Sequence, residues 1–291
     1  MYADPFDFVA ARSWQEAVDL LREGGEDAKV IAGGQSLIPM MTLRLATPGL
    51  LVDVNGADTS RVERHGDRLV ISGVTRHSDL QGSPVVGADC PMLAEAASMV
   101  GNVRVRHRGT IGGSLAHADP SAELPCAVVA LGAEVRTLGP DGERGIPAND
   151  FFEFYFTSVL KPGEIVTGVE VPVSAGGSGW SFLELLRRAS DFAVVAVAVV
   201  VELDGEGRCS GAKLAAAGVG ERPIELGDAA GVLVGELIDE RLAAEAGRRA
   251  AASVQPSASV HASAEYRRAM LGVYVRRAVL QAARRAGGKA A

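Results

Sequence analysis

Two Gly-Gly pairs constrain the fold of this chain more than any other feature. Gly33-Gly34 follows the apolar stretch Lys29–Ala32 and precedes Ser36, and Gly112-Gly113 precedes Ser114 about eighty residues later. Because glycine has no Cβ atom, its backbone can approach a bulky anion, and successive N–H groups can form a concave nest. The two segments therefore predict a site where two distant parts of the chain meet one charged ligand.

The chain contains five Gly-Gly pairs in all, at positions 24–25, 33–34, 112–113, 176–177 and 287–288. The other three lie in polar or terminal stretches and are expected to be turns or linkers. The hydroxyls of Ser36, Thr110 and Ser114 can each donate to an oxygen. Two facing nests suit a pyrophosphate, which favours a dinucleotide ligand. The G-x-G-x-x-G and G-x-x-x-x-G-K-[ST] patterns are absent, so a Rossmann or P-loop site is not supported.

Composition excludes several functions. A net charge of −7 argues against a general nucleic-acid binder, which needs a basic surface. The longest apolar run, Phe192–Val201, suits a buried strand and is too short to span a bilayer. The N-terminus shows no signal-peptide pattern, so a cytoplasmic protein without a transmembrane segment is expected. The three cysteines are widely separated and predict buried thiols, with no iron–sulfur or zinc site on this chain.

The pattern along the chain predicts an α+β protein. Ser13-x-x-Glu16 is a capping box that opens an amphipathic helix, and with the strands Lys29–Ala32 and Leu50–Val54 it forms a small β-α-β unit. Helices are expected at Met92–Met99 and Glu123–Leu131. A glycine- and serine-rich stretch, Ser174–Gly179, is expected to link two domains. Beyond it, the pattern predicts strands at 181–186, 193–203 and 211–218, followed by helices at 227–234, 239–252 and 262–285.

Two long motifs make the chain resemble a known family. These are Ala32-Gly33-Gly34-Gln35-Ser36-Leu37-Ile38-Pro39 and Thr110-Ile111-Gly112-Gly113-Ser114-Leu115-Ala116-His117-Ala118-Asp119-Pro120. They are similar to the paired FAD loops of the FAD-binding medium subunits of molybdenum hydroxylases, of the aerobic carbon monoxide dehydrogenase and xanthine dehydrogenase type. Shorter collinear motifs support the resemblance over nearly the whole chain, at 51–55, 101–106, 163–165 and 188–193.

The resemblance implies a vanillyl-alcohol-oxidase-type (PCMH-type) FAD-binding domain at residues 1–175. This domain would comprise two α/β subdomains, about 1–56 and 57–175. An α+β C-terminal domain of antiparallel sheet and helices would follow at 176–291. FAD is the cofactor that the resemblance implies.

The resemblance also implies which residues bind FAD. One group would surround the pyrophosphate and ribityl chain: Lys29, Val30, Ile31, Ala32, Gly33, Gly34, Gln35, Ser36 and Leu37. The second loop would add Thr110, Ile111, Gly112, Gly113, Ser114 and Ala118, with Asp119 and Glu123 near the ribose and ribityl hydroxyls. Val100 would lie by the adenine, and Leu160 and Phe192 by the flavin ring.

Two positions depart from the family pattern. Phe192 stands where a tyrosine is common, which keeps the ring face and loses the hydroxyl. Some relatives carry a lysine in the stretch that reads Leu183-Glu184-Leu185-Leu186 in this chain. A cationic contact to the flavin from that stretch is therefore not expected here.

Other polar residues are assigned no chemistry. His107, His117 and Asp119 fit no metal-ligand spacing, and Ser114-x-x-His117-x-Asp119 lacks a nucleophile elbow. No metal site and no catalytic residue are therefore predicted on this chain. The alternating residues Arg104, Arg106 and Arg108 are expected to share one face of a short strand.

The resemblance implies an electron-transfer subunit of a larger oxidoreductase. Its partners would be a large subunit with the molybdenum cofactor and a small subunit with two 2Fe-2S clusters, in a heterohexamer. Electrons would pass through FAD to an external acceptor, and the chain alone would not oxidise the substrate. Two alternatives stay open: a self-sufficient FAD-dependent oxidase or reductase, and a non-enzymatic nucleotide-binding module.

Overall fold

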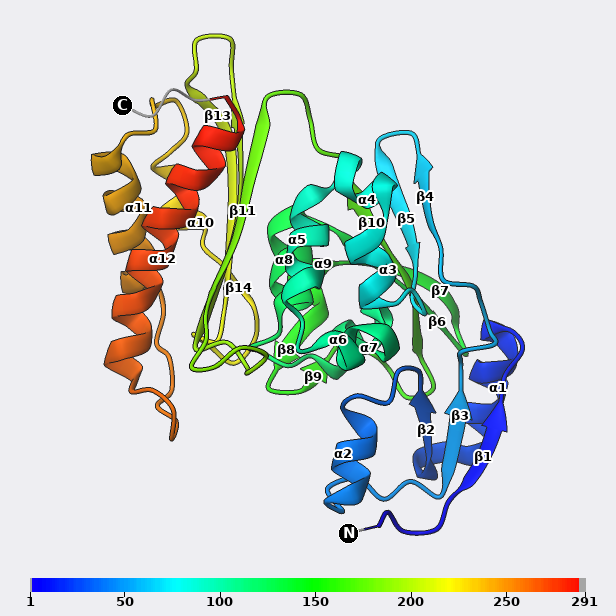
Figure 1. The fold of residues 1–291 in the computed structure, drawn as a ribbon. Coiled ribbons are helices and arrows are strands. Elements are labelled where there is room, and N and C mark those ends of the chain that lie inside the picture. The colour runs from blue at the N-terminus through cyan, green and yellow to red at the C-terminus, as the bar shows by residue number, and fades with distance from the viewer. Residues whose placement is uncertain (1, 288–291) are drawn as a thin grey trace.

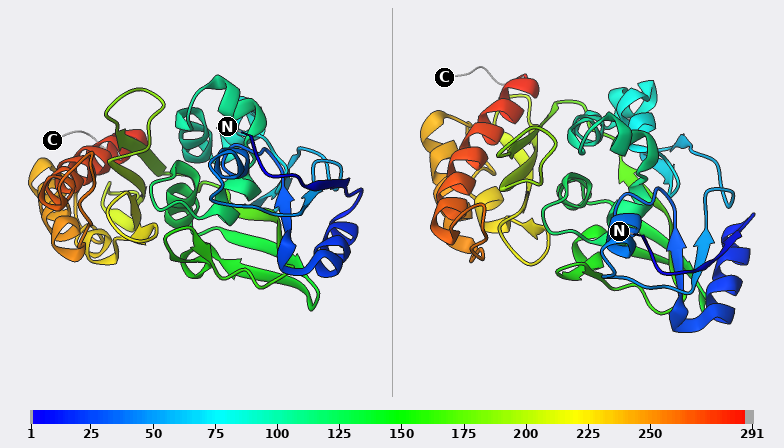
Figure 2. Two further views of the ribbon diagram at one scale, coloured as in Figure 1. Left: turned by 90° about the horizontal axis from the view of Figure 1, so that it is seen from below. Right: turned by 60° about the horizontal axis from the view of Figure 1, so that its bottom comes forward.

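The structure, a computed structural model, describes residues 2–287. The chain forms three consecutive parts: a small N-terminal sheet with its helix, a larger middle part, and a C-terminal sheet covered by helices (Figure 1). Figure 2 shows the same order from two further directions, with the C-terminal helices at one end of the molecule and α1 at the other. The fifth Gly-Gly pair, 287–288, lies partly outside the described residues.

The N-terminal sheet is parallel, with strand order β1-β3-β2. Its elements are β1 (Asp7–Ala10), α1 (Trp14–Gly24), a 3-10 turn (Gly25–Asp27), β2 (Ala28–Ile31), α2 (Leu37–Thr42) and β3 (Leu50–Asp53). The first half of the predicted capping box is present, since the Ser13 side chain accepts from Glu16 N, while the Glu16 carboxylate accepts from Arg12 N at 2.7 Å, one residue before the N-cap. The sequence patterns did not predict β1, because its side chains are all exposed and show no alternation.

The middle part contains an antiparallel sheet with strand order β4-β5-β10-β6-β7. The strands of this sheet are β4 (Val62–His65), β5 (Arg68–Ser72), β6 (Glu134–Gly139), β7 (Gly142–Pro147) and β10 (Ile165–Pro172). A separate two-stranded sheet is formed by β8 (Phe152–Phe154) and β9 (Thr157–Ser158). The helices of the middle part are α3 (His77–Gly82), α4 (Pro84–Asp89), α5 (Pro91–Met99), α6 (Val103–Arg108), α7 (Ile111–His117), α8 (Glu123–Leu131) and α9 (Ala148–Phe151).

The C-terminal part is an antiparallel sheet with strand order β11-β12-β13-β14. Its elements are β11 (Ser178–Leu185), β12 (Val195–Leu203), β13 (Cys209–Ala217), β14 (Ile224–Glu225), α10 (Gly227–Gly231), α11 (Glu240–Ser253) and α12 (Ala264–Arg285). Helices α11 and α12 cover the face of this sheet that is turned away from the middle part (Figure 1). The α+β architecture agrees with the predicted fold class.

Strand β12 explains why the sequence contains a continuous apolar run there. Val195, Val197 and Val199 belong to the core under the C-terminal helices, while Ala196 and Ala198 belong to the core shared with the middle part. A strand buried on both faces is apolar at every position instead of alternating. The smaller side chains face α8, which packs against β12 and β13.

Two local predictions are wrong. Residues 103–108 form a helix and not a strand, because the Asn102 side chain accepts from Arg104 N and Val105 N and so caps a helix. The sequence predicts a loop at Gly112-Gly113 like that at Gly33-Gly34, but the pair lies in the first turn of helix α7. The predicted linker Ser174–Gly179 overlaps the connection between β10 and β11, although β11 begins at Ser178 and includes its last two residues. The division into domains at 175–176 stays a prediction.

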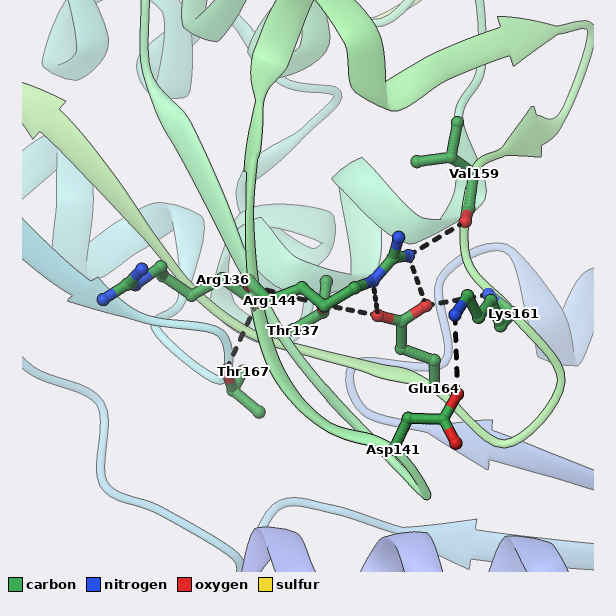
Figure 3. Close-up of polar contacts among 8 residues, drawn as sticks. All are labelled: Arg136, Thr137, Asp141, Arg144, Val159, Lys161, Glu164 and Thr167. Atoms are coloured by element: carbon green, nitrogen blue, oxygen red, sulfur yellow. Dashed lines mark hydrogen bonds and ion pairs between the residues drawn. The ribbon is translucent and has the colours of Figure 1, made fainter.

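A buried carboxylate stabilises the segment between β9 and β10, which carries Leu160 (Figure 3). Glu164 accepts from both Arg144 Nε and Nη2 at 2.7 Å and from Lys161 N at 2.8 Å. Arg144 Nη2 also donates to the Val159 carbonyl at 3.2 Å. Burial alone would raise the pKa of Glu164, but the hydrogen bonds from Arg144, Lys161 N and Thr137 outweigh it and lower the pKa to about 2.

We expect Glu164→Gln to lower the urea midpoint of unfolding at pH 7. Because the folded-state pKa lies below the ordinary value, this stabilisation is present above about pH 4.5 and is lost as the pH falls toward 2. The difference between wild type and variant should therefore shrink at pH 3. Asp141→Asn is the matched control, since the Lys161–Asp141 pair is exposed and should contribute little. Equal shifts for both variants would contradict this account.

Candidate functional site

The first glycine segment presents a row of free backbone donors. Residues 32–36 connect β2 to α2, and Gly34 has φ +72°, a conformation that favours glycine. Within residues 2–287, no hydrogen bond uses the N–H groups of Ala32 through Ser36. Consecutive free N–H groups of this kind form an anion-binding concavity. This segment therefore agrees with the predicted nest.

The second glycine segment differs from the first. Ile111 N donates to the Thr75 carbonyl at 3.0 Å, and Gly112 N donates to the Gly73 carbonyl at 2.9 Å. Gly113 N donates to Thr110 Oγ1 at 3.1 Å, which caps α7. Because these N–H groups already have partners, the expectation of a second backbone nest is not met. The groups that this segment can offer a ligand are the hydroxyls of Thr110 and Ser114.

Through Gly33, the first segment contacts Arg108 and Gly109, the two residues directly before the second motif. A Cβ atom built on Gly33 would lie 2.2 Å from the Arg108 carbonyl oxygen and 2.7 Å from the Gly109 Cα atom. Real Cβ atoms do not approach other atoms so closely, so only glycine fits between the two backbones. The fold therefore brings together the two motifs that the sequence paired.

Two acidic side chains, Asp119 and Glu123, follow the second glycine segment between the end of α7 and the start of α8. Ala118, with φ +52°, ends α7, and Asp119 is buried and accepts from Ser121 N at 2.8 Å. Glu123 is the first residue of α8, where burial raises its pKa to about 7 and the charge of Asp119 adds to the rise. Burial also raises the pKa of Asp119.

Glu184 of β11 adds a third carboxyl to this group. Burial raises the pKa of Glu184 to about 8, and the charge of Glu123 contributes. Its Oε2 atom is buried and has no hydrogen-bond partner among the described residues. The sequence placed Glu184 in a stretch that departs from the family but did not assign it to the site. Glu184 and Glu123 lie near enough for the charge of Glu123 to help raise the pKa of Glu184.

The remaining predicted residues lie on other segments. Lys29, Val30 and Ile31 form the end of β2, Gln35 is exposed and Leu37 begins α2.

Val100 is buried at the end of α5, and its carbonyl accepts from Arg106 at 3.1 Å. Leu160 packs against the core of the middle part. Phe192 lies between β11 and β12 with 72% of its surface exposed.

Two polar residues that connect the glycine segments were not assigned from the sequence. Asn55 Nδ2 donates to the Ala32 carbonyl at 2.9 Å, and Arg76 Nη2 donates to Asn55 Oδ1 at 2.6 Å. Arg76 Nη1 donates to the Arg108 carbonyl at 2.5 Å. A positional signal existed for Asn55, since it follows β3 at the carboxyl edge of a parallel sheet, where ligands commonly bind.

These observations fit a bound FAD. A pyrophosphate needs several donors, and residues 32–36 present them in a row beside the hydroxyl-bearing second segment. Sugar and ribityl hydroxyls need acceptors, and Asp119 and Glu123 supply carboxyl oxygens close by. In the described ranges, no three His, Cys, Asp or Glu side chains come close enough to hold a metal ion. None of the helices described has the length and apolar character needed to cross a membrane.

The chain belongs to the FAD-binding medium subunits of the molybdenum hydroxylases, and its cofactor is FAD. Residues 4–174 match the family described as the FAD binding domain in molybdopterin dehydrogenase. Residues 180–282 match the C-terminal domain of the carbon monoxide dehydrogenase flavoprotein. The resemblance inferred from the two motifs is thereby confirmed, and so is the PCMH-type fold.

Individual relatives are similar over nearly their full length. The alpha subunit of the 6-hydroxypseudooxynicotine dehydrogenase complex of Paenarthrobacter nicotinovorans is 39% identical, over 97% of this chain and 95% of the relative. The carbon monoxide dehydrogenase medium chain of Afipia carboxidovorans is 36% identical, over 98% and 99%. A structure of carbon monoxide dehydrogenase from Hydrogenophaga pseudoflava superposes with a TM-score of 0.95 at 37% identity, covering 98% and 99% of the two chains.

We expect Gly33→Ala to weaken FAD binding about ten- to a hundredfold, because overpacking costs about 1–3 kcal/mol and would force the two backbones apart. The measurement is titration of the deflavinated chain with FAD. Gly87→Ala is the matched control: it lies in α4 with open space around its Cβ position, and FAD affinity should not change. Gly113→Ala should have a smaller effect than Gly33→Ala, since its Cβ would meet only the Thr110 hydroxyl. Unchanged FAD affinity in Gly33→Ala would count against the site.

Proposed function

We propose that this chain is the electron-transfer subunit of a molybdenum hydroxylase complex. Electrons would come from 2Fe-2S clusters of a small partner subunit and leave to an external acceptor. Substrate would be oxidised at the molybdenum cofactor of a large partner subunit, in a heterohexameric, cytoplasmic complex. The observation that carries this proposal is the close approach of Gly33 to Arg108 and Gly109, because it brings the free N–H groups of residues 32–36 to the start of the second motif, as a shared FAD pyrophosphate would require.

The twenty residues that the resemblance implies would bind and orient the cofactor. The free N–H groups of residues 32–36 would hold the pyrophosphate, and Thr110 and Ser114 would add hydroxyl contacts. Asp119 and Glu123 would accept from the ribose and ribityl hydroxyls. FAD itself supplies the redox chemistry when bound, while the protein fixes its position and surroundings.

The substrate would be selected by another subunit. The relatives reported above are named for different substrates, carbon monoxide and 6-hydroxypseudooxynicotine, although this chain is similar to both over nearly its whole length. None of the residues assigned to the FAD site would act as a general acid or base on a substrate. The predicted two-domain division at 175–176 is supported by the family matches, since the first ends at residue 174 and the second begins at residue 180.

The test is what the native chain purifies with and what it does alone. We expect the isolated full-length chain to bind FAD and to show no turnover with reducing substrates, whereas the native complex should contain molybdenum and iron. Turnover by the isolated chain would instead support a self-sufficient oxidase or reductase. A colourless chain that cannot be reconstituted with FAD would support a nucleotide-binding module and overturn the proposal.

Phe192 provides a second test of the flavin position. Stacking of an aromatic ring contributes about 0.5–1.5 kcal/mol, so Phe192→Ala should weaken FAD binding about two- to tenfold and alter the fluorescence of bound flavin. Phe192→Tyr should keep the affinity because the ring face is retained. Phe154→Ala is the control, since Phe154 is also exposed but is not assigned to the flavin. Equal effects of Phe192→Ala and Phe154→Ala would exclude a specific contact.

A further inference from the structure

A polar bridge of two side chains, Asn55 and Arg76, connects the first glycine segment to the residue before Gly109. Asn55, directly after β3, donates to the carbonyl of Ala32 in the first segment at 2.9 Å. Arg76, at the start of α3, donates to Asn55 Oδ1 at 2.6 Å and to the carbonyl of Arg108, next to the second segment, at 2.5 Å. Two side chains thus connect the backbone of one segment to the backbone of the other.

The bridge is itself fixed at both ends. Asn55 N donates to Asp53 Oδ1 at 2.9 Å, and the Asn55 side chain also contacts that carboxylate. Arg76 forms an isolated β-bridge with Thr110, and His77 N donates to the Gly109 carbonyl at 3.1 Å. The buried ring of His77 fills the space beside Gly109, where a Cβ would lie 2.6 Å from Nε2. The second segment is therefore held on one side by α3 and on the other by Gly33.

The hydrogen bonds of the bridge use the planar fork of arginine. Nη1 and Nη2 donate to acceptors on two different segments, and both acceptors are neutral. Among the described residues, no salt bridge pairs Arg76 with a carboxylate, so replacing Arg76 orphans no buried anion. A lysine would keep the charge, but a single ammonium on a flexible stem cannot reproduce a two-pronged donor at fixed spacing.

We propose that Asn55 and Arg76 are positioning residues that set the separation of the two FAD-binding segments. The inference rests on the proposed FAD site, because it concerns how that site is held. The consequence is specific: the free N–H groups of residues 32–36 and the hydroxyls of Thr110 and Ser114 reach one pyrophosphate only at a fixed distance from each other. Loosening the bridge should weaken FAD binding through geometry and not through loss of positive charge.

The experiment compares five forms of the deflavinated full-length chain: wild type, Arg76→Met, Arg76→Lys, Asn55→Ala and the double variant Asn55→Ala/Arg76→Met. FAD affinity is measured by titration well below each form's unfolding midpoint. We expect each single variant to bind FAD about tenfold more weakly, the effect of one or two lost hydrogen bonds. The double variant should bind about as weakly as either single variant, because both substitutions break the same bridge.

The matched control is Arg104→Met, which removes one positive charge from exposed α6 close to the second segment. It should leave FAD affinity unchanged. If Arg76→Lys binds FAD like the wild type, charge alone matters and the inference is overturned. Additive losses in the double variant, or unchanged affinity in both single variants, would also overturn it. Wild-type chain that fails to bind FAD would instead refute the proposed function, so the two failures are distinguishable.

Discussion

The burial of helix α8 is the constraint on which the arrangement of this molecule depends. Every residue from Leu124 to Leu131 is buried, because the helix lies between the middle part and the sheet of β12 and β13. A helix that is apolar on all sides must be covered on all sides. The covering is provided by small residues of β12 and β13, including Ala196, Ala198 and Ala215. The packing thereby fixes Glu123, at the start of α8, which contacts α7, and brings its charge near enough to Asp119 and Glu184 to affect their shared environment.

The two glycine segments share a motif but make different contributions to the site. The first leaves its N–H groups free from Ala32 to Ser36, whereas the second uses those of Ile111, Gly112 and Gly113 to build and anchor α7. The first segment therefore offers free backbone N–H groups, and the second offers side-chain hydroxyls. Gly33 sets the closest approach of the two, and the bridge of Asn55 and Arg76 connects them from behind.

Much of the fold was predictable because strong local signals agreed with it. The predicted helix Glu123–Leu131 is found with the same bounds, and the capping box at Ser13 starts α1 as expected. Prediction failed where two local signals favoured different secondary structures for the same segment. Alternating arginines suggested a strand at 104–108, but Asn102 offered a better cap for a helix. β1 was missed because a fully exposed edge strand carries no burial pattern.

The sequence by itself determined the family, the cofactor and the two motifs of the site, because a long motif can be recognised from its residue types without knowing how the chain packs. Only the tertiary structure decided which donors are free, since a backbone N–H is available only if no other part of the fold accepts it. It also decided the roles of Asn55, Arg76 and Glu184. Their partners lie on segments distant in sequence, and no local pattern records a contact that long-range packing creates.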